Sequence, residues 1–123
     1  MKKTINTEMI QNVLVVQITC NKLVASNREN FKSSMDTCME QHHDILVDMT
    51  RVEYIDSSGL GSLLHCLRKT NNINGRLRLF GVNPPIMSLF KLIHLDQVFN
   101  INRNLDEALE NLKNPEWPRL DKT

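Results

Sequence analysis

Short apolar runs along the chain predict buried β-strands. Residues 13–18 read Val-Leu-Val-Val-Gln-Ile and residues 45–49 read Ile-Leu-Val-Asp-Met. Both runs are rich in aliphatic and β-branched side chains and are too short for a helix. Residues 4–9 are expected to pair with the first run through a turn at Gln11-Asn12. We therefore expect a hairpin at the start of the chain and a second buried strand further along.

A second pattern, with apolar side chains three or four positions apart, predicts helices between these strands. An early helix is expected after Ser26 or Asn27, because either side chain can accept a hydrogen bond from the free N–H groups of a first helical turn. Its apolar positions are Phe31, Met35, Cys38 and Met39. The clearest stripe, at i, i+3, i+4 and i+7, consists of Leu60, Leu63, Leu64 and Leu67. Asn83 and Asn104 are expected to cap two further helices.

In the second half of the chain, apolar and basic residues alternate over residues 76–80, which predicts a strand after the turn at Asn74-Gly75. The alternation points Arg76 and Arg78 to one face, where a solvated edge is expected rather than an anion site. A last short strand is expected at residues 98–101. Because strands and helices alternate from residue 13 to residue 113, the sequence favours crossover connections and a mostly parallel sheet.

The length of 123 residues is that of one domain. We assign residues 1–113 to that domain and residues 114–123, which include two prolines, to a flexible C-terminal tail. Fifteen basic and fourteen acidic residues leave a net charge of +1. This balance argues against direct binding of nucleic acid and against a polybasic membrane anchor.

Three cysteines, far apart in sequence and odd in number, do not suggest a disulfide framework or a zinc site; they are Cys20, Cys38 and Cys66. The N-terminus lacks an apolar signal core, and no apolar run approaches the roughly 20 residues that span a bilayer. The expected location is therefore the cytoplasm, with no membrane association.

The most informative segment is residues 54–61, Tyr-Ile-Asp-Ser-Ser-Gly-Leu-Gly, which joins the second buried strand to the leucine-striped helix. Asp56 and Ser57 stand where a helix N-cap belongs. Gly59 and Gly61 put no bulk on the first turn, so another molecule could approach the backbone closely.

Two interpretations of this segment remain open from the residues alone. In the first, Asp-Ser-Ser is a capping sequence and the glycines keep the turn clear of its neighbours. In the second, the serine also accepts a phosphate, because free N–H groups and the positive end of the helix dipole stabilise added negative charge. A partner on this turn would then meet about two negative charges where there had been a hydroxyl.

These residues carry a family resemblance. Residues 45–49, 52–61, 74–77, 83–85, 95–99 and 105–109 together resemble the STAS domain, in particular the bacterial anti-sigma factor antagonists. The resemblance spans roughly residues 8–112. It implies a STAS-like α/β fold, a single domain with a mostly parallel or mixed sheet of four to five strands and about four helices.

The resemblance also implies a function without cofactor, metal or catalytic residue. In this family, an anti-sigma factor that is also a serine kinase phosphorylates the serine after the aspartate, here Ser57. The unphosphorylated form binds the anti-sigma factor and frees the sigma factor, and a PP2C-type phosphatase resets the switch. The implied partner-binding residues are Asn21, Lys22, Leu23, Val24, Asp56, Ser58, Gly59 and Leu60. A monomer or weak dimer is expected.

One departure from the family pattern lies in the loop after the first buried strand. Where the family commonly has Gly-x-Leu-Asp, this chain has Asn21 and Val24 in place of the glycine and the aspartate. Any role of that carboxylate in kinase recognition is lost. The departure favours a second hypothesis, a STAS module that is never phosphorylated and serves as an accessory subunit of a transporter or signalling complex.

Catalysis is not favoured by the sequence. Ser57 lies at a strand-to-helix turn, as nucleophiles often do, but no Gly-x-Ser-x-Gly elbow surrounds it. His65 lies about two helical turns further on, too far along the same helix to reach Ser57. The pair His42-His43 lacks a further nearby ligand for a metal site.

Overall fold

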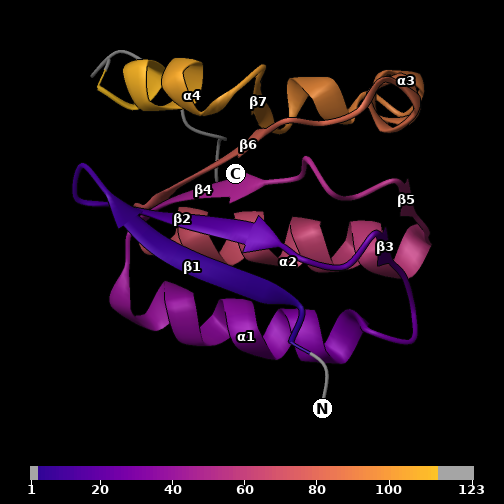
Figure 1. The fold of residues 1–123 in the computed structure, drawn as a ribbon, viewed down its shortest axis with the longest axis horizontal. Helices are drawn as coiled ribbons and strands as arrows, with labels where there is room; N and C mark the ends of the chain where they lie inside the picture. The colour runs from indigo at the N-terminus through magenta and orange to yellow at the C-terminus, as the bar shows by residue number, and fades with distance from the viewer. Residues whose placement is uncertain (1–2, 114–123) are drawn as a thin grey trace.

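The protein folds into strands and helices that alternate along the chain (Figure 1); this computed structural model describes residues 3–113. The elements are β1 (Ile5–Ile10), β2 (Val13–Ile18), β3 (Lys22–Leu23), α1 (Arg28–Gln41), β4 (Asp44–Asp48), β5 (Tyr54–Ile55), α2 (Ser57–Asn72), β6 (Arg76–Phe80), α3 (Pro84–Leu92), the 3-10 turn η1 (Leu95–Gln97), β7 (Asn100–Asn102) and α4 (Leu105–Leu112). The predicted tail at residues 114–123 lies outside the described residues.

The main sheet has the strand order β1-β2-β4-β6-β7. Strands β1 and β2 form an antiparallel hairpin, and the other three pairs are parallel. Gln11 and Asn12 close the hairpin with φ angles of 52° and 66°, the left-handed conformation that tight hairpin turns require. The predicted hairpin and the mostly parallel α/β sheet are therefore confirmed.

Helices cover both faces of this sheet, with α1 and α2 on one side and α4 on the other (Figure 1). The larger apolar core joins α1, α2 and α3 to the side chains of β2, β4 and β6 that face them; its fully buried members include Phe31, Met35, Ile45, Val47, Leu79 and Phe90. A smaller core lies under α4 and consists of Val15, Leu46, Phe80, Ala108, Leu109 and Leu112. Each strand between helices therefore buries both of its faces, as parallel strands usually do.

The arginines of β6 contradict the prediction of a solvated edge. Strand β6 lies between β4 and β7, and α4 covers the face on which the arginines lie. Arg78 is fully buried, and burial together with the neighbouring Arg76 lowers its pKa to about 10. Arg76 makes two hydrogen bonds of 3.1 Å to the Asp44 carboxylate and donates to the Leu112 carbonyl at 2.9 Å. Arg76 and Arg78 do lie on one face of β6, as the alternation predicts. That face packs under α4 and does not face solvent.

Of the helix caps predicted away from the Asp56 turn, those at Asn83 and Asn104 are confirmed and the one at Ser26 or Asn27 is not. The side chain of Asn83 accepts a hydrogen bond from Ile86 N, and that of Asn104 accepts one from Glu107 N. Asn27 occupies the cap position of α1 but makes no side-chain cap bond, and Ser26 lies before it. The last strand begins at Asn100 and not at residue 98, because the N–H groups of Val98 and Phe99 bond back to the Leu95 carbonyl in η1.

Cysteine side chains contribute to the larger core as free thiols. Cys66 is buried, while Cys20 and Cys38 are half-buried and pack against the core. Burial, with a smaller contribution from nearby Asp36, raises the pKa of Cys66 to about 12. This thiol therefore behaves as an apolar group at neutral pH.

Candidate functional site

Asp56 is the N-cap of α2, as predicted. Its backbone is extended, with φ −101° and ψ −177°, and its Oδ1 accepts a hydrogen bond of 2.9 Å from Gly59 N. The Asp56 carbonyl accepts the first helical bond from Leu60 N at 2.9 Å. Ser57 is consequently the first residue of the helix, where its exposed side chain lies beside the positive end of the helix dipole.

The second carboxylate oxygen of Asp56 holds a different part of the chain. Asp56 Oδ2 accepts a hydrogen bond of 3.1 Å from Ala25 N, which lies 31 residues earlier. The bond from Gly59 N, followed by that from Ala25 N, lowers the pKa of the Asp56 carboxyl and outweighs the effect of its partial burial. Asp56 therefore stays ionised and joins the loop of residues 21–27 to the start of α2.

Gly59 does not leave space for another molecule; it keeps the turn clear of its own neighbours, as the capping interpretation expected. A Cβ atom at this position would lie 2.0 Å from the carbonyl oxygen of Leu23 and 3.0 Å from Ile55. The glycine lets the first turn of α2 pack directly on β3 of its own chain. At Gly61 nothing lies within 4 Å of an added Cβ, so only this second glycine faces open space.

The side chain of Asn27 organises the loop instead of capping α1. Its Oδ1 accepts a hydrogen bond of 2.9 Å from Val24 N, and its Nδ2 donates one of 2.7 Å to the Lys22 carbonyl. Sequence reasoning missed this role, because an asparagine before a helix carries the same signal whether it caps the helix or bonds the preceding loop. The loop is thus held from one side by Asn27 and from the other by Asp56.

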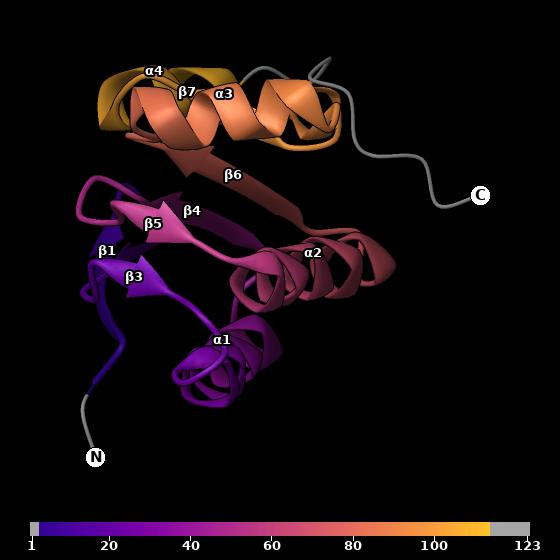
Figure 2. The same cartoon turned by 90° about the vertical axis from the view of Figure 1, so that its right-hand side faces the viewer.

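Strands β3 and β5 form a separate two-stranded parallel sheet that joins the loop to the Ser57 turn (Figure 2). Lys22 pairs with Tyr54, and Leu23 pairs with Ile55. Asn21 O accepts hydrogen bonds from Glu53 N and Tyr54 N, at 2.7 and 3.2 Å. The structure therefore brings the two predicted segments, residues 21–24 and 56–60, to one end of the molecule.

The predicted site residues divide into those on the surface and those beneath it. Asn21, Lys22 and Ser57 are exposed, whereas Val24, Asp56, Ser58 and Leu60 are half-buried. Leu23 and Gly59 are buried, so they support the site from beneath and are not available for direct contact with a partner. Tyr54, which sequence reasoning did not include, has 54% of its surface exposed beside them.

The chemistry available at this site is that of an exposed hydroxyl on a helix N-terminus. The histidine of α2, His65, lies eight residues along the helix, where its Nε2 is 3.1 Å from Asp36 Oδ1. Among residues 3–113, no group of three histidine, cysteine, aspartate or glutamate side chains is placed to hold a metal ion. Over the same residues, no helix has the length and apolar character needed to cross a membrane.

Comparison with known proteins decides the family. The STAS domain model matches residues 4–108, most of the chain. This protein belongs to the STAS domain family. Its strand order and its helices on both faces of the sheet match the fold of solved members of this family.

Several relatives of this STAS protein are named as anti-sigma factor antagonists. The anti-sigma F factor antagonist of Paenibacillus polymyxa is 27% identical over 115 residues, which cover 92% of this chain and 97% of that protein. The solved anti-sigma-factor antagonist domain protein of Planctomyces limnophilus superposes with a TM-score of 0.81 at 21% identity, covering 89% and 98% of the two chains. The Bacillus protein SpoIIAA, solved in its phosphorylated form, gives a TM-score of 0.67 at 21% identity, covering 89% and 99%.

Proposed function

We propose that this STAS protein is an anti-sigma factor antagonist in which Ser57 is the switch. The unphosphorylated form binds an anti-sigma factor that is also a serine kinase, and so releases the sigma factor. Phosphorylation of Ser57 by that kinase ends the binding, and a PP2C-type phosphatase restores it. The observation that carries the proposal is the exposed Ser57 hydroxyl on the first residue of α2, directly after the Asp56 cap.

Physical reasoning supports a switch at this position. A phosphoserine at a helix N-terminus gains from the helix dipole, so the fold tolerates the added charge. The surface changes more than the fold: beside the ionised Asp56, the local charge goes from roughly −1 to roughly −3. A partner surface that accommodates a hydroxyl would meet concentrated negative charge, and like-charge or desolvation penalties at an interface weaken binding strongly.

The loop that departs from the family pattern still forms an ordered part of this face. Val24 N bonds to Asn27 Oδ1, and the following residue, Ala25, bonds to Asp56. The loop is therefore held in place without a carboxylate at position 24. Val24 remains the one observation that favours the second candidate, a STAS accessory module of a larger assembly that is not phosphorylated.

Intact-mass spectrometry separates these two candidates. The full chain is incubated with ATP and the serine kinase encoded nearest to its gene, beside the variants Ser57→Ala and Ser58→Ala. The antagonist hypothesis predicts one phosphate on the natural chain and on Ser58→Ala, none on Ser57→Ala, and removal of the phosphate by a PP2C-type phosphatase. If a kinase active on another substrate leaves all three proteins unmodified, the accessory-module hypothesis replaces it.

A further inference from the structure

An exposed aromatic side chain lies beside the Ser57 turn. In the described part of the chain, the large hydrophobic side chains that remain exposed are Met9, Tyr54, Ile73, Leu92 and Ile93. Of these, Tyr54 belongs to the strand that leads directly into α2. Tyrosine is among the residues that most often dominate binding energy when an interface covers them.

The register of the small sheet explains why Tyr54 points outward together with a lysine. Leu23 and Ile55, which pair with each other, are 0% and 5% exposed and belong to the core. Since side chains alternate along a strand, the preceding pair, Lys22 and Tyr54, lies on the opposite, outer face. Residues that pair across parallel strands are close neighbours, so the side chains of Lys22 and Tyr54, both exposed, leave the sheet side by side on its outer face.

The backbone under this pair is held firmly. Asn21 O accepts from both Glu53 N and Tyr54 N, and Leu23 O accepts from Asp56 N at 3.2 Å. These bonds fix the short strand β5 on β3. A side chain on a fixed backbone loses less conformational entropy when a partner covers it, which makes it a good anchor.

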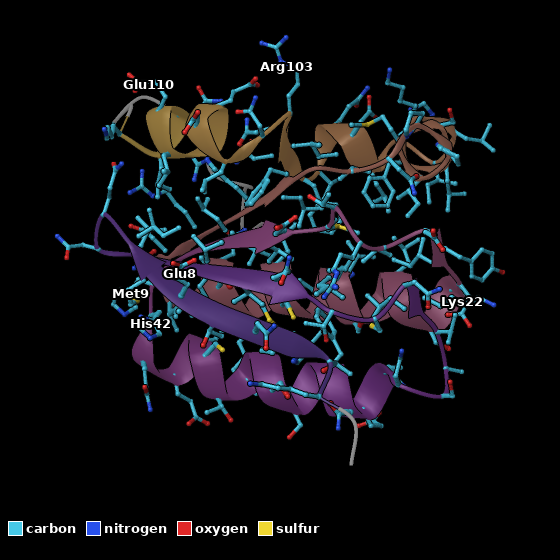
Figure 3. All side chains as sticks on the ribbon, viewed as in Figure 1. Glu8, Met9, Lys22, His42, Arg103 and Glu110 are labelled. Carbon is cyan, nitrogen blue, oxygen red and sulfur yellow. The ribbon has the colours of Figure 1, made fainter. Side chains whose placement is uncertain are left out.

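Lys22 is available to a partner's charge. Within residues 3–113 its ammonium group makes no ion pair, and it projects from the end of the molecule at which β3 and β5 lie (Figure 3). The complementary group on a partner is a carboxylate. A charge at the rim of an interface acts mainly on the rate of association.

Tyr54 lies close to Ser57, at a distance that a bound kinase can span. Ser57 follows Tyr54 by three positions, so their Cα atoms are at most about 11 Å apart. A standard interface buries about 800 Å² on each partner, a disc with a radius of roughly 16 Å. An interface of this size centred on the Ser57 hydroxyl therefore extends far enough to include Tyr54.

We propose that Tyr54 and Lys22 form the anchor by which the anti-sigma factor kinase recognises this chain, with the phenol ring in an apolar pocket of the kinase and the ammonium group facing one of its carboxylates. This inference depends on the proposed function. The anchor does not touch the reacting atoms, so it acts on binding and not on phosphoryl transfer. Its signature is a change in KM for phosphorylation of Ser57 at nearly constant kcat.

The test is steady-state phosphorylation of the full chain by the kinase, with the natural protein beside Tyr54→Ala, Tyr54→Phe, Lys22→Glu and Met9→Ala. Tyr54→Ala is expected to raise KM about 10-fold or more, since loss of an interface anchor has an effect of that order. Tyr54→Phe keeps the ring and should retain most of the affinity. Lys22→Glu should raise KM at low salt and less at high salt, because salt screens the charge.

Met9→Ala is the matched control. Met9 is 52% exposed, close to the value for Tyr54, but it lies at the opposite end of the molecule from Lys22 (Figure 3). Its KM should equal that of the natural chain. Circular dichroism of each variant checks folding, and the exposed Lys22→Glu change tests the anchor even if Tyr54→Ala fails to fold.

Each remaining outcome has a distinct meaning. A natural chain that takes a phosphate, together with Tyr54→Ala and Lys22→Glu variants of unchanged KM, overturns the anchor and leaves the proposed function standing. A natural chain that takes no phosphate overturns the proposed function and the anchor with it. If Tyr54→Ala alters only self-association, as measured by light scattering, the pair belongs to a contact between copies and the kinase anchor is wrong.

Discussion

Asp56 and Ala25, 31 residues apart in the chain, are joined by a hydrogen bond of 3.1 Å from the backbone N–H of Ala25 to Asp56 Oδ2. The same carboxylate caps α2 through Gly59 N at 2.9 Å. One side chain thus sets both the start of the helix that carries Ser57 and the position of the loop beside it. Interactions at Asp56 therefore affect stability and site geometry together.

Replacement of Asp56 should lower stability in a graded order. Asp56→Asn keeps an oxygen that caps the helix but loses the charge and one of the two bonds, and Asp56→Ala loses both bonds. We expect Tm to fall from the natural chain to Asp56→Asn and further to Asp56→Ala. Thermal unfolding followed by circular dichroism measures this, and equal Tm values for all three proteins would contradict the dual role of the carboxylate.

The two glycines of the first turns of α2 should respond in opposite directions to alanine. Gly59→Ala forces a methyl group against the Leu23 carbonyl, where 2.0 Å is available, and should reduce the free energy of unfolding by about 2 kcal/mol or more. Gly61→Ala meets open space and should increase it by about 0.5–1 kcal/mol, since alanine favours a helix over glycine.

Urea denaturation of both variants gives the comparison. Because both changes add the same methyl group to the same helix, helix propensity affects them alike, and the difference reports the contact with β3. If Gly59→Ala is as stable as Gly61→Ala, the close approach of α2 to Leu23 is wrong.

Asp36 should make the stability of the protein fall in acid. Burial raises the pKa of Asp36, but hydrogen bonds from His65 and Lys69 outweigh it and leave the pKa below the ordinary value of 3.8. A carboxyl with a lowered pKa in the folded state stabilises the fold above its unfolded pKa. This contribution is lost as pH falls through the folded pKa.

The variant Asp36→Asn tests this pH dependence. Near pH 7 the variant should be less stable than the natural chain by about 0.5 kcal/mol, a typical value for a pair that is partly exposed to solvent. The difference should shrink as the pH falls below 3.8. Urea denaturation at a series of pH values measures it, and a difference that is constant down to the lowest pH would show that Asp36 acts by packing alone.

A permanent negative charge at position 57 should separate folding from binding. Ser57→Glu places a carboxylate at the N-terminus of α2, where the helix dipole favours it, so Tm should be equal to or above that of the natural chain. Affinity for the anti-sigma factor should fall about 10-fold or more because of like-charge and desolvation penalties. Isothermal titration calorimetry measures the affinity, with Ser57→Ala as the uncharged control that should still bind. Binding of Ser57→Glu at natural affinity would argue against an electrostatic switch.

Features that depend on near neighbours in the chain were predicted from the sequence. The turn at Gln11-Asn12, where Ile10 pairs with Val13, and the caps at Asp56, Asn83 and Asn104 each join residues three positions apart. Local patterns carry such interactions because both partners lie within the same short segment. The family signature around Ser57 likewise comes from one continuous stretch.

Features that depend on which segments meet in space were decided by the tertiary structure. Arg78 alternates with leucines like a residue on a solvated face, yet α4, more than twenty residues later in the chain, covers that face and buries it. From the sequence, Gly59 could either admit another molecule or clear a neighbouring segment, and the structure shows that it clears β3. Asn27 is a standard capping residue, but its side chain bonds the preceding loop instead.

The candidate site shows the same division. The proposed switch residue, Ser57, and the helix cap, Asp56, can be identified from the sequence, because a turn that begins a helix has its own residue preferences. The pairing of Lys22 with Tyr54 and the bond from Ala25 to Asp56 each join residues more than thirty positions apart. No local pattern specifies such contacts, since they form only when core burial brings β3 and β5 together. The sequence by itself therefore determined the helix-starting turn at which we propose the switch, and the tertiary structure determined the surface that surrounds it.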